Sequence, residues 1–261
     1  MSANGVEDER QRTPANMLDI ARLLLDAGAA VDATSEAYGG GSTTLGLAST
    51  SAHPRAAGVQ IALIDLLLEK GARIDGEHDL RALVTGAIAN GCPEAARALA
   101  GRGARVSTLY AAAGVGNLRQ AQALFDTSST SMRESALIVA AMQGHTTIVE
   151  FLLDHGVDIA ACDGMTALHA ASAGGHLETM AVLIDRGAPL EALNAYGGSV
   201  LDGTLWFAFH ARDEDFAVRD YPRVIVALIA AGARTDRYPG MRAHIAEIHA
   251  RARRHDAPAT A

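Results

Sequence analysis

The chain has 261 residues, of which 49% are hydrophobic and only 4% aromatic, and its formal net charge at pH 7 is −8. The acidic balance argues against nucleic acid as the main partner, because binding to phosphates requires clustered lysine and arginine. With so few aromatic side chains, the composition favours closely stacked helices built from alanine, leucine, isoleucine and valine.

The sequence predicts a cytoplasmic protein. Residues 1–12 are polar and charged and lack the apolar segment of a secretory signal peptide. The longest strongly apolar run, residues 224–231, is far shorter than the roughly 20 residues of a membrane-spanning helix. Cys92 and Cys162 are far apart and not in metal-ligand spacing, as expected of reduced thiols.

The first recognisable element is the segment LLLDAGAAVD at 23–32, which is typical of a helix that ends in a glycine turn. The preceding segment SANGVEDERQRTPAN resembles the end of an earlier helix followed by a long turn, so that only part of a partner helix would precede residues 23–32. Leu18, Ile20 and Leu23 would therefore lack a partner. Either residues 1–16 fold back as a cap, or the natural product is longer than this chain.

The glycine run YGGGSTTLGL at 38–47 admits two interpretations. Its glycines could cradle a phosphate, or they could form a turn that requires unusual backbone angles. A phosphate loop would have lysine after the glycines, and none follows here. A similar stretch, YGGSVL, recurs at 196–201, again without lysine. Both stretches therefore predict a turn that leads into a helix.

A regular spacing runs through the middle of the chain. Val84, an apolar residue that opens a helix, lies 19 residues before the turn glycine Gly103. The same distance separates Leu137 and Leu168 from the turn glycines that follow them. These two leucines are 31 residues apart. A fixed period of this size predicts a stacked repeat in which each short helix depends on its neighbours. Within this pattern Pro93 suits the first turn of a helix.

The motif TALHAA at 166–171 and the segments FLLDHGVDI (151–159) and VLIDRGAPL (182–190) resemble the ankyrin repeat. The resemblance implies an all-α ankyrin-repeat solenoid of stacked helix pairs with short β-turn fingers, forming a single domain over 1–261. The implied units are a partial first repeat at 1–33, repeats at 34–75, 76–106, 107–130, 131–162, 163–194 and 195–236, and a capping helix and tail at 237–261.

Two turns between helices are longer than the family pattern. The leucine-to-glycine distance grows to 26 residues from Leu45 and to 31 residues from Leu201. The extra residues fall at 50–60 and 209–222. An alternative hypothesis is therefore a small-ligand-binding protein or enzyme with a pocket under these insertions, which would use His53, Arg55, His210 or Asp213.

The C-terminal segment MRAHIAEIHARARRH at 241–255 has a narrow apolar stripe, Ile245 and Ile248, and a basic last turn. A capping helix is one interpretation, because basic residues favour a helix C-terminus. A basic tail that binds nucleic acid or an acidic partner is the other.

The histidines do not predict catalysis or metal binding. His145, His169 and His176 match positions that the ankyrin resemblance assigns to hydrogen bonds with the backbone. No Cys, Asp or Glu completes a coordination set around them. We therefore expect no catalytic residue, no metal and no cofactor.

The aromatic residues concentrate near one place. Five of the 11 lie within 16 residues, including Trp206 and Phe207. Trp206 either contacts a partner or packs under the neighbouring insertion, and packing is favoured for Phe209. The resemblance implies a non-enzymatic protein–protein interaction scaffold that binds an unidentified protein on its concave face and enlarged turns. The candidate contact residues are Tyr38, Met142, Gln143, Met165, Tyr196, Trp206 and Phe207.

Overall fold

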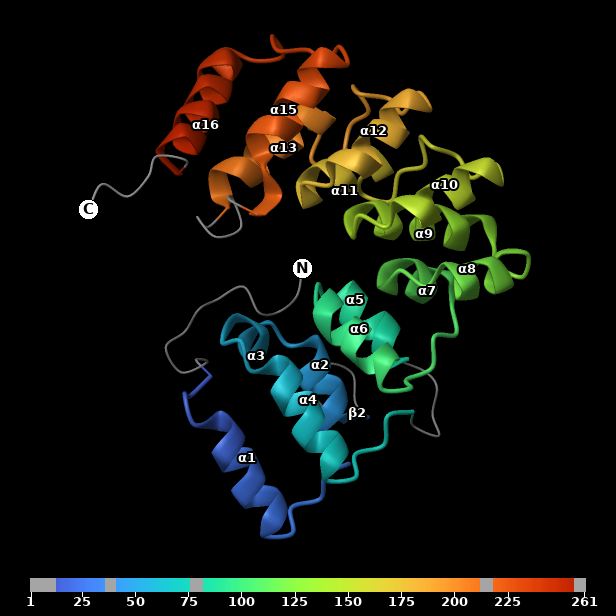
Figure 1. Cartoon of the computed structure of the whole chain (residues 1–261), viewed down its shortest axis with the longest axis vertical. Helices are drawn as coiled ribbons and strands as arrows, with labels where there is room; N and C mark the ends of the chain where they lie inside the picture. Colours follow the sequence, from blue (N-terminus) through green and yellow to red (C-terminus); the bar gives the residue numbers. More distant parts are fainter. Residues whose placement is uncertain (1–12, 36–40, 76–81, 212–217, 256–261) are drawn as a thin grey trace. The chain divides into compact units, whose positions relative to one another are not determined.

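The computed structural model describes residues 13–35, 41–75, 82–211 and 218–255 (Figure 1). They belong to two compact units, Met1–Val115 and Gly116–Ala261. Regular structure in both units is almost entirely helical, and the predicted all-α arrangement of stacked helix pairs is confirmed in each of them.

The first unit stacks its helices in two layers. α2, α5 and α7 pack on one another in order, and α1, α4 and α6 do the same beside them. A two-residue antiparallel finger, in which Thr34 pairs with Thr43, precedes α2. The elements are α1 (Met17–Asp26), β1 (Thr34–Ser35), β2 (Ser42–Thr43), α2 (Thr44–Thr50), α3 (Ala52–Ala56), α4 (Gln60–Glu69), α5 (Leu83–Ala89), α6 (Pro93–Gly101) and α7 (Leu109–Val115).

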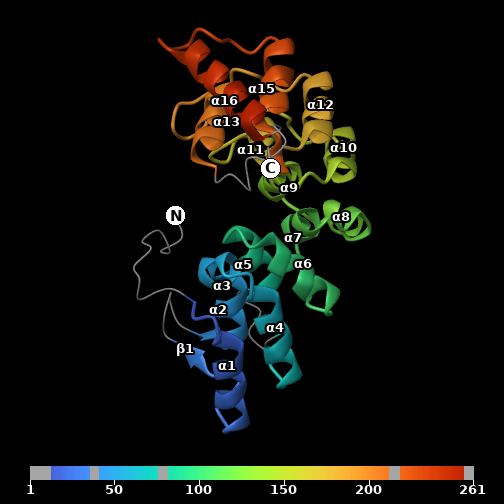
Figure 2. The same ribbon diagram turned by 60° about the vertical axis from the view of Figure 1, so that its left-hand side comes forward.

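The second unit repeats this two-layer plan. α9, α11 and α13 form one layer, and α8, α10, α12 and α15 form the other; Figure 2 shows α10 and α12 beside α9 and α11. α16 packs on α13 and α15 after the last pair. The elements are α8 (Leu118–Phe125), α9 (Thr130–Met142), α10 (Thr146–Asp154), α11 (Ala167–Gly174), α12 (Leu177–Asp185), α13 (Val200–His210), α15 (Tyr221–Ala230) and α16 (Met241–His255).

Small side chains allow the layers to approach closely. In α11, Leu168 and the alanines at 167, 170 and 171 are fully buried, and α9 buries Ala136, Ala140 and Ala141 in the same way. Alanine leaves room for a neighbouring backbone and also favours helix, so the low aromatic content suits this core. α9 begins at Thr130, one residue before the repeat boundary expected at 131.

The predicted turn signals have their expected roles. Gly187 follows α12 with a φ of +81°, the left-handed conformation that glycine tolerates best. Gly41 has a φ of +71°, and Thr43, two residues later, caps α2 by accepting a hydrogen bond from the N–H of Gly46 at 3.1 Å. Pro93 begins α6. Gly39 and Gly40 lie outside the described residues.

The insertion at 50–60 folds as a helical turn. Ser51 caps α3, and Pro54 of α3 is buried. The buried side chain of Gln60 donates from Nε2 to the carbonyl oxygens of Ala48, Ser49 and Ser51 at 2.9, 3.2 and 3.1 Å. These carbonyls lie at the C-terminal end of α2, where helix oxygens need outside donors. The insertion is therefore tied to the helix pair it separates.

Candidate partner-binding surface

α13 positions the aromatic cluster, and its first turn is firmly fixed. Ser199 and Asp202 form a reciprocal capping box, in which Asp202 Oδ2 accepts from the Ser199 N–H at 2.8 Å and from its hydroxyl at 2.9 Å. Arg237 Nε lies 2.8 Å from the same carboxylate oxygen, and Arg237 Nη1 lies 3.3 Å from Glu191 Oε2. These contacts connect α13 to the segment that leads into α16.

The C-terminal end of α13 is fixed by α16. Arg251 donates from Nη1 to the carbonyl of Ala208 and from Nη2 to that of Ala211, both at 2.9 Å. A guanidinium at this place satisfies free helix carbonyls and favours the negative end of the helix dipole. Met241 and Ile248 of α16 are buried. The basic residue Arg251 thus acts on a neighbouring helix.

Trp206 is the exposed centre of the cluster. Its side chain is 57% exposed on α13. The ring stacks on His210 with centroids 4.4 Å apart and meets Phe207 edge-on at 5.1 Å. His210 Nδ1 donates to the carbonyl of Trp206 at 2.7 Å, which fixes the imidazole against the indole. The indole therefore presents a supported aromatic face to solvent.

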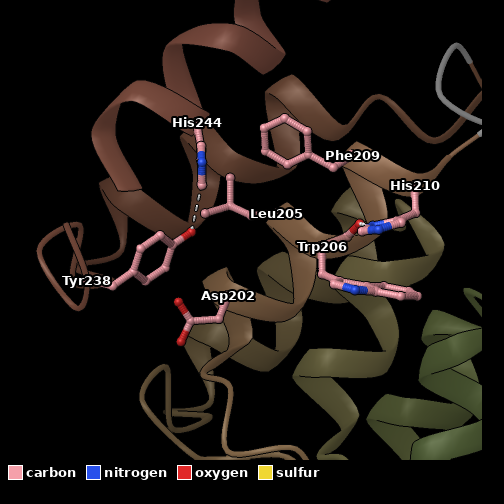
Figure 3. Close-up of a pocket in the computed structure, with 7 residues that line it drawn as sticks. All are labelled: Asp202, Leu205, Trp206, Phe209, His210, Tyr238 and His244. Carbon is pink, nitrogen blue, oxygen red and sulfur yellow. Dashed lines mark hydrogen bonds between the residues drawn. The ribbon is translucent and has the colours of Figure 1, made fainter. Parts of the chain in front are cut away.

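A pocket of about 540 Å³ opens between α13 and α16 (Figure 3). On its α16 side, His244 meets Phe209 edge-on at 5.1 Å and shares a 3.2 Å hydrogen bond with the hydroxyl of Tyr238. Burial, and then the negative charge of Asp202, raises the pKa of Tyr238, so its hydroxyl stays protonated. The lining residues are Asp202, Leu205, Trp206, Phe209, His210, Tyr238 and His244.

A smaller pocket of about 200 Å³ lies on another side of Trp206. Tyr221, which is fully buried, donates its hydroxyl to the carbonyl of Ala173 at 3.2 Å, and Arg219 Nη1 donates to the same oxygen at 3.1 Å. These bonds fix the start of α15 to the end of α11. Trp206 and His210 line both pockets, so the two hollows form one aromatic surface.

The predicted contact residues that the structure describes lie at three places in the second unit. Trp206 and Phe207 lie together on α13, and Met142, 38% exposed, lies at the end of α9 beside Gln143. Met165 and the 94% exposed Tyr196 lie in the turns before α11 and α13. These turns are joined by a 2.8 Å bond from the Ala195 N–H to the Gly164 carbonyl. Tyr38 lies outside the described residues.

The residues of the alternative pocket hypothesis do not come together in one site. His210 lines both hollows, whereas Arg55 donates from Nη1 to the carbonyl of Gly91, and neither it nor His53 lines the two pockets. Asp213 lies outside the described residues. Tyr238 and His244 were missed by the sequence reasoning, because only the packing of α16 on α13 brings them to the aromatic cluster.

The histidines at repeat positions connect neighbouring repeats. His169 Nδ1 lies 2.8 Å from the Thr166 hydroxyl, and Nε2 lies 3.2 Å from the Gly198 carbonyl, which suits a neutral ring with its proton on Nε2. His176 Nε2 donates to the Met142 carbonyl at 2.9 Å. Burial lowers the pKa of both histidines. Within the described residues, no three His, Cys, Asp or Glu side chains gather as a metal site.

Comparison with known proteins identifies the repeat. Residues 108–194 match the family model described as ankyrin repeats, in three copies. Residues 108–194 of this protein are ankyrin repeats. No curated protein matches the chain. Ankyrin repeats generally mediate protein–protein interaction and are generally not enzymes. None of the described helices is long and apolar enough to cross a membrane.

Proposed function

We propose that this protein is a non-enzymatic scaffold that holds a protein partner on the face formed by α9, α11 and α13. Trp206 and Phe207 would anchor the partner, and Met142, Gln143 and the turns with Met165 and Tyr196 would extend the contact. This is the face that the family resemblance identifies as concave. The observation that carries the proposal is the exposed, well-supported indole of Trp206 between two hollows.

The energetics favour this location. Tryptophan and tyrosine are over-represented among the residues that dominate interface energies, and methionine adapts to irregular partners. Trp206 is already held against His210 and Phe207, so little side-chain entropy remains to be lost when a partner binds. The capping box and Arg251 fix both ends of α13, which presents the ring on a stiff support.

A matched pair of variants tests the proposal. Trp206→Asp alters the 57% exposed side chain on α13, and Val226→Asp alters a 54% exposed side chain on α15, in the other layer. Each full-length variant is checked by circular dichroism and used as bait with native cell lysate, and captured proteins are quantified by mass spectrometry. We expect Val226→Asp to retain the partner and Trp206→Asp to lose it. Equal capture by both variants would refute the proposed surface.

The 540 Å³ pocket supports a second candidate, the binding of a small ligand. Its size lies within the roughly 300–1,000 Å³ of ligand sites, and its walls combine aromatic rings with a few polar groups. Trp206 is the only tryptophan of the chain and lines the pocket, so its fluorescence reports occupancy. A compound that shifts this emission and raises the melting temperature would favour ligand binding. A screen in which no compound does both would count against it.

A further inference from the structure

The pocket between α13 and α16 has aromatic walls on several sides. Phe209 and Tyr238 are each 36% exposed and Trp206 is 57% exposed, so all three keep ring surface available to a ligand. In Figure 3 these three rings lie around the buried side chain of Leu205, and Asp202 lies beside it. The hollow therefore combines three π systems with a carboxylate.

The wall of this pocket carries negative charge. Asp202 and Glu191 both contact the guanidinium of Arg237, at 2.8 and 3.3 Å, and two carboxylates against one guanidinium leave a net charge of −1. The charge of Asp202 is also felt by Tyr238, another lining residue, because it adds to the effect of burial in raising the pKa of that hydroxyl. A positively charged ligand is therefore favoured here and an anion is disfavoured.

The rings and the carboxylate together suit one kind of cation. The face of an aromatic ring attracts a cation within about 6 Å of its centre, and the attraction grows when water is excluded. A metal ion or a primary ammonium would give up much of its hydration in a hollow lined mainly by rings and Leu205, and the described residues gather no metal site. A quaternary ammonium gives up less, because alkyl groups already cover its charge. The volume of about 540 Å³ holds such a head together with further atoms.

We propose that this pocket binds an organic cation of the quaternary-ammonium class, with its alkylated head against Phe209, Tyr238 and Trp206 and on the side of Asp202. The inference rests on the second candidate function, the binding of a ligand in this pocket, and names the class of that ligand. The same head can belong to a free small molecule or to an alkylated side chain of a protein partner, and the experiment separates these two sources.

Two probes of the same shape isolate the effect of charge. Choline carries a trimethylammonium head, and 3,3-dimethyl-1-butanol has a neutral carbon in place of the nitrogen. Each is titrated into the full chain at constant ionic strength and at about pH 8, where an ordinary histidine is neutral. The emission of Trp206, the only tryptophan of the chain, reports binding. We expect choline to bind about tenfold more tightly than the alcohol, because the ring faces and the carboxylate attract only the cation.

Matched variants locate the binding site. In Phe209→Leu an apolar wall remains but the π system is lost, so choline binding should weaken about two- to fivefold while binding of the alcohol stays the same. Asp202→Asn should also weaken choline binding alone, and because Asp202 caps α13, circular dichroism first checks that this variant is folded. Val226→Ser alters an exposed side chain on α15 outside the pocket lining, and it should change neither affinity.

A glycine-flanked peptide that carries one trimethylated lysine is the third probe, and it identifies the source of the cation. Tighter binding of the peptide than of choline would assign the head to a protein partner, and the reverse would assign it to a free molecule; both results support the cation. The proposal is overturned if the alcohol binds as tightly as choline, or if Phe209→Leu weakens both equally. Ligand binding in the pocket would then stand, with an apolar ligand. If none of the three probes binds, the cation is excluded, whereas ligand binding as such is decided separately by the compound screen.

Discussion

At the scale of single residues, Gly175 and Gly187 have the same backbone conformation but different surroundings. Their φ angles are +77° and +81°. A Cβ on Gly187 would meet nothing within 4 Å, whereas a Cβ on Gly175 would overlap the carbonyl oxygen of Arg219 and lie 2.7 Å from its Cα. Gly175 thus provides both a turn and the close approach that lets Arg219 and Tyr221 reach α11.

This difference gives a test by substitution. Gly187→Ala should lower the free energy of unfolding by about 1 kcal/mol, the cost of a side chain at positive φ. Gly175→Ala should cost more, about 3 kcal/mol, because the backbone of residue 219 must also move. Urea denaturation of both variants measures the two losses. Equal losses would show that the contact with Arg219 has no energetic importance.

His169 and His176 make stability depend on pH. Burial lowers the pKa of both rings in the folded protein, so folding favours their neutral forms. Their contribution is complete above the unfolded pKa of about 6.5 and is lost as the pH falls through that value toward the folded pKa. The double variant His169→Gln, His176→Gln should therefore lose less stability between pH 7 and 5 than the unaltered chain does.

Urea midpoints measured at several pH values check this expectation. Carboxylate protonation contributes to both proteins, so the difference between their pH profiles isolates the two rings. Parallel profiles would contradict the assigned role of the histidines.

At the scale of elements, acidic side chains connect successive turns. The acidic residue that lies four positions after one turn glycine accepts a hydrogen bond from the backbone N–H that lies two positions after the next turn glycine. Asp32 accepts from Arg73 at 3.0 Å, and Glu191 accepts from Arg234 at 2.8 Å. Where the next turn carries Pro189, which has no N–H, the acid position is Ala160. At this pair of turns the donor N–H and the acceptor carboxylate are both missing, so neither group is left without its partner.

Sequence spacing predicted helix pairs but not how the insertions fold. Leucine-to-glycine distances located α9 to α12 because regular repeats fix both ends of each pair. In the insertion at 50–60, α3 was not predicted, since five residues carry too little periodicity and its main support is the buried polar Gln60. Polar residues in a turn are normally solvated, so only the structure reveals this role.

Gln60→Leu tests that support. Leucine is more apolar at a 3% exposed position, yet it should destabilise the protein by about 1–3 kcal/mol, because three carbonyl oxygens lose their donor. Gln60→Glu should be worse, since a carboxylate would face these oxygens. Thermal unfolding, monitored by circular dichroism, ranks the stabilities of the two variants and the unaltered chain. A leucine variant as stable as the unaltered chain would mean that water replaces the amide.

At the scale of the whole molecule, each unit presents its own exposed apolar surface. The first exposes Ile20, Leu23 and Leu24 on α1, and the second exposes Trp206 beside its pockets. Clustering of aromatic residues in the sequence predicted Trp206 and Phe207 as candidate contacts. The pocket was not predictable in the same way, because His244 reaches it only through the packing of α16, which Arg251 fixes by bonds to a helix 40 residues earlier.

The most direct test of the proposed function uses photo-crosslinking. A benzoylphenylalanine is placed in the full chain at position 142 on α9, and in a control chain at position 226 on α15, each an exposed site in a different layer. After irradiation in cells, crosslinked proteins are identified by mass spectrometry. We predict a protein crosslinked from position 142 and absent from 226. A crosslink from 226 alone, or none from 142, would contradict a partner held on the face of α9, α11 and α13.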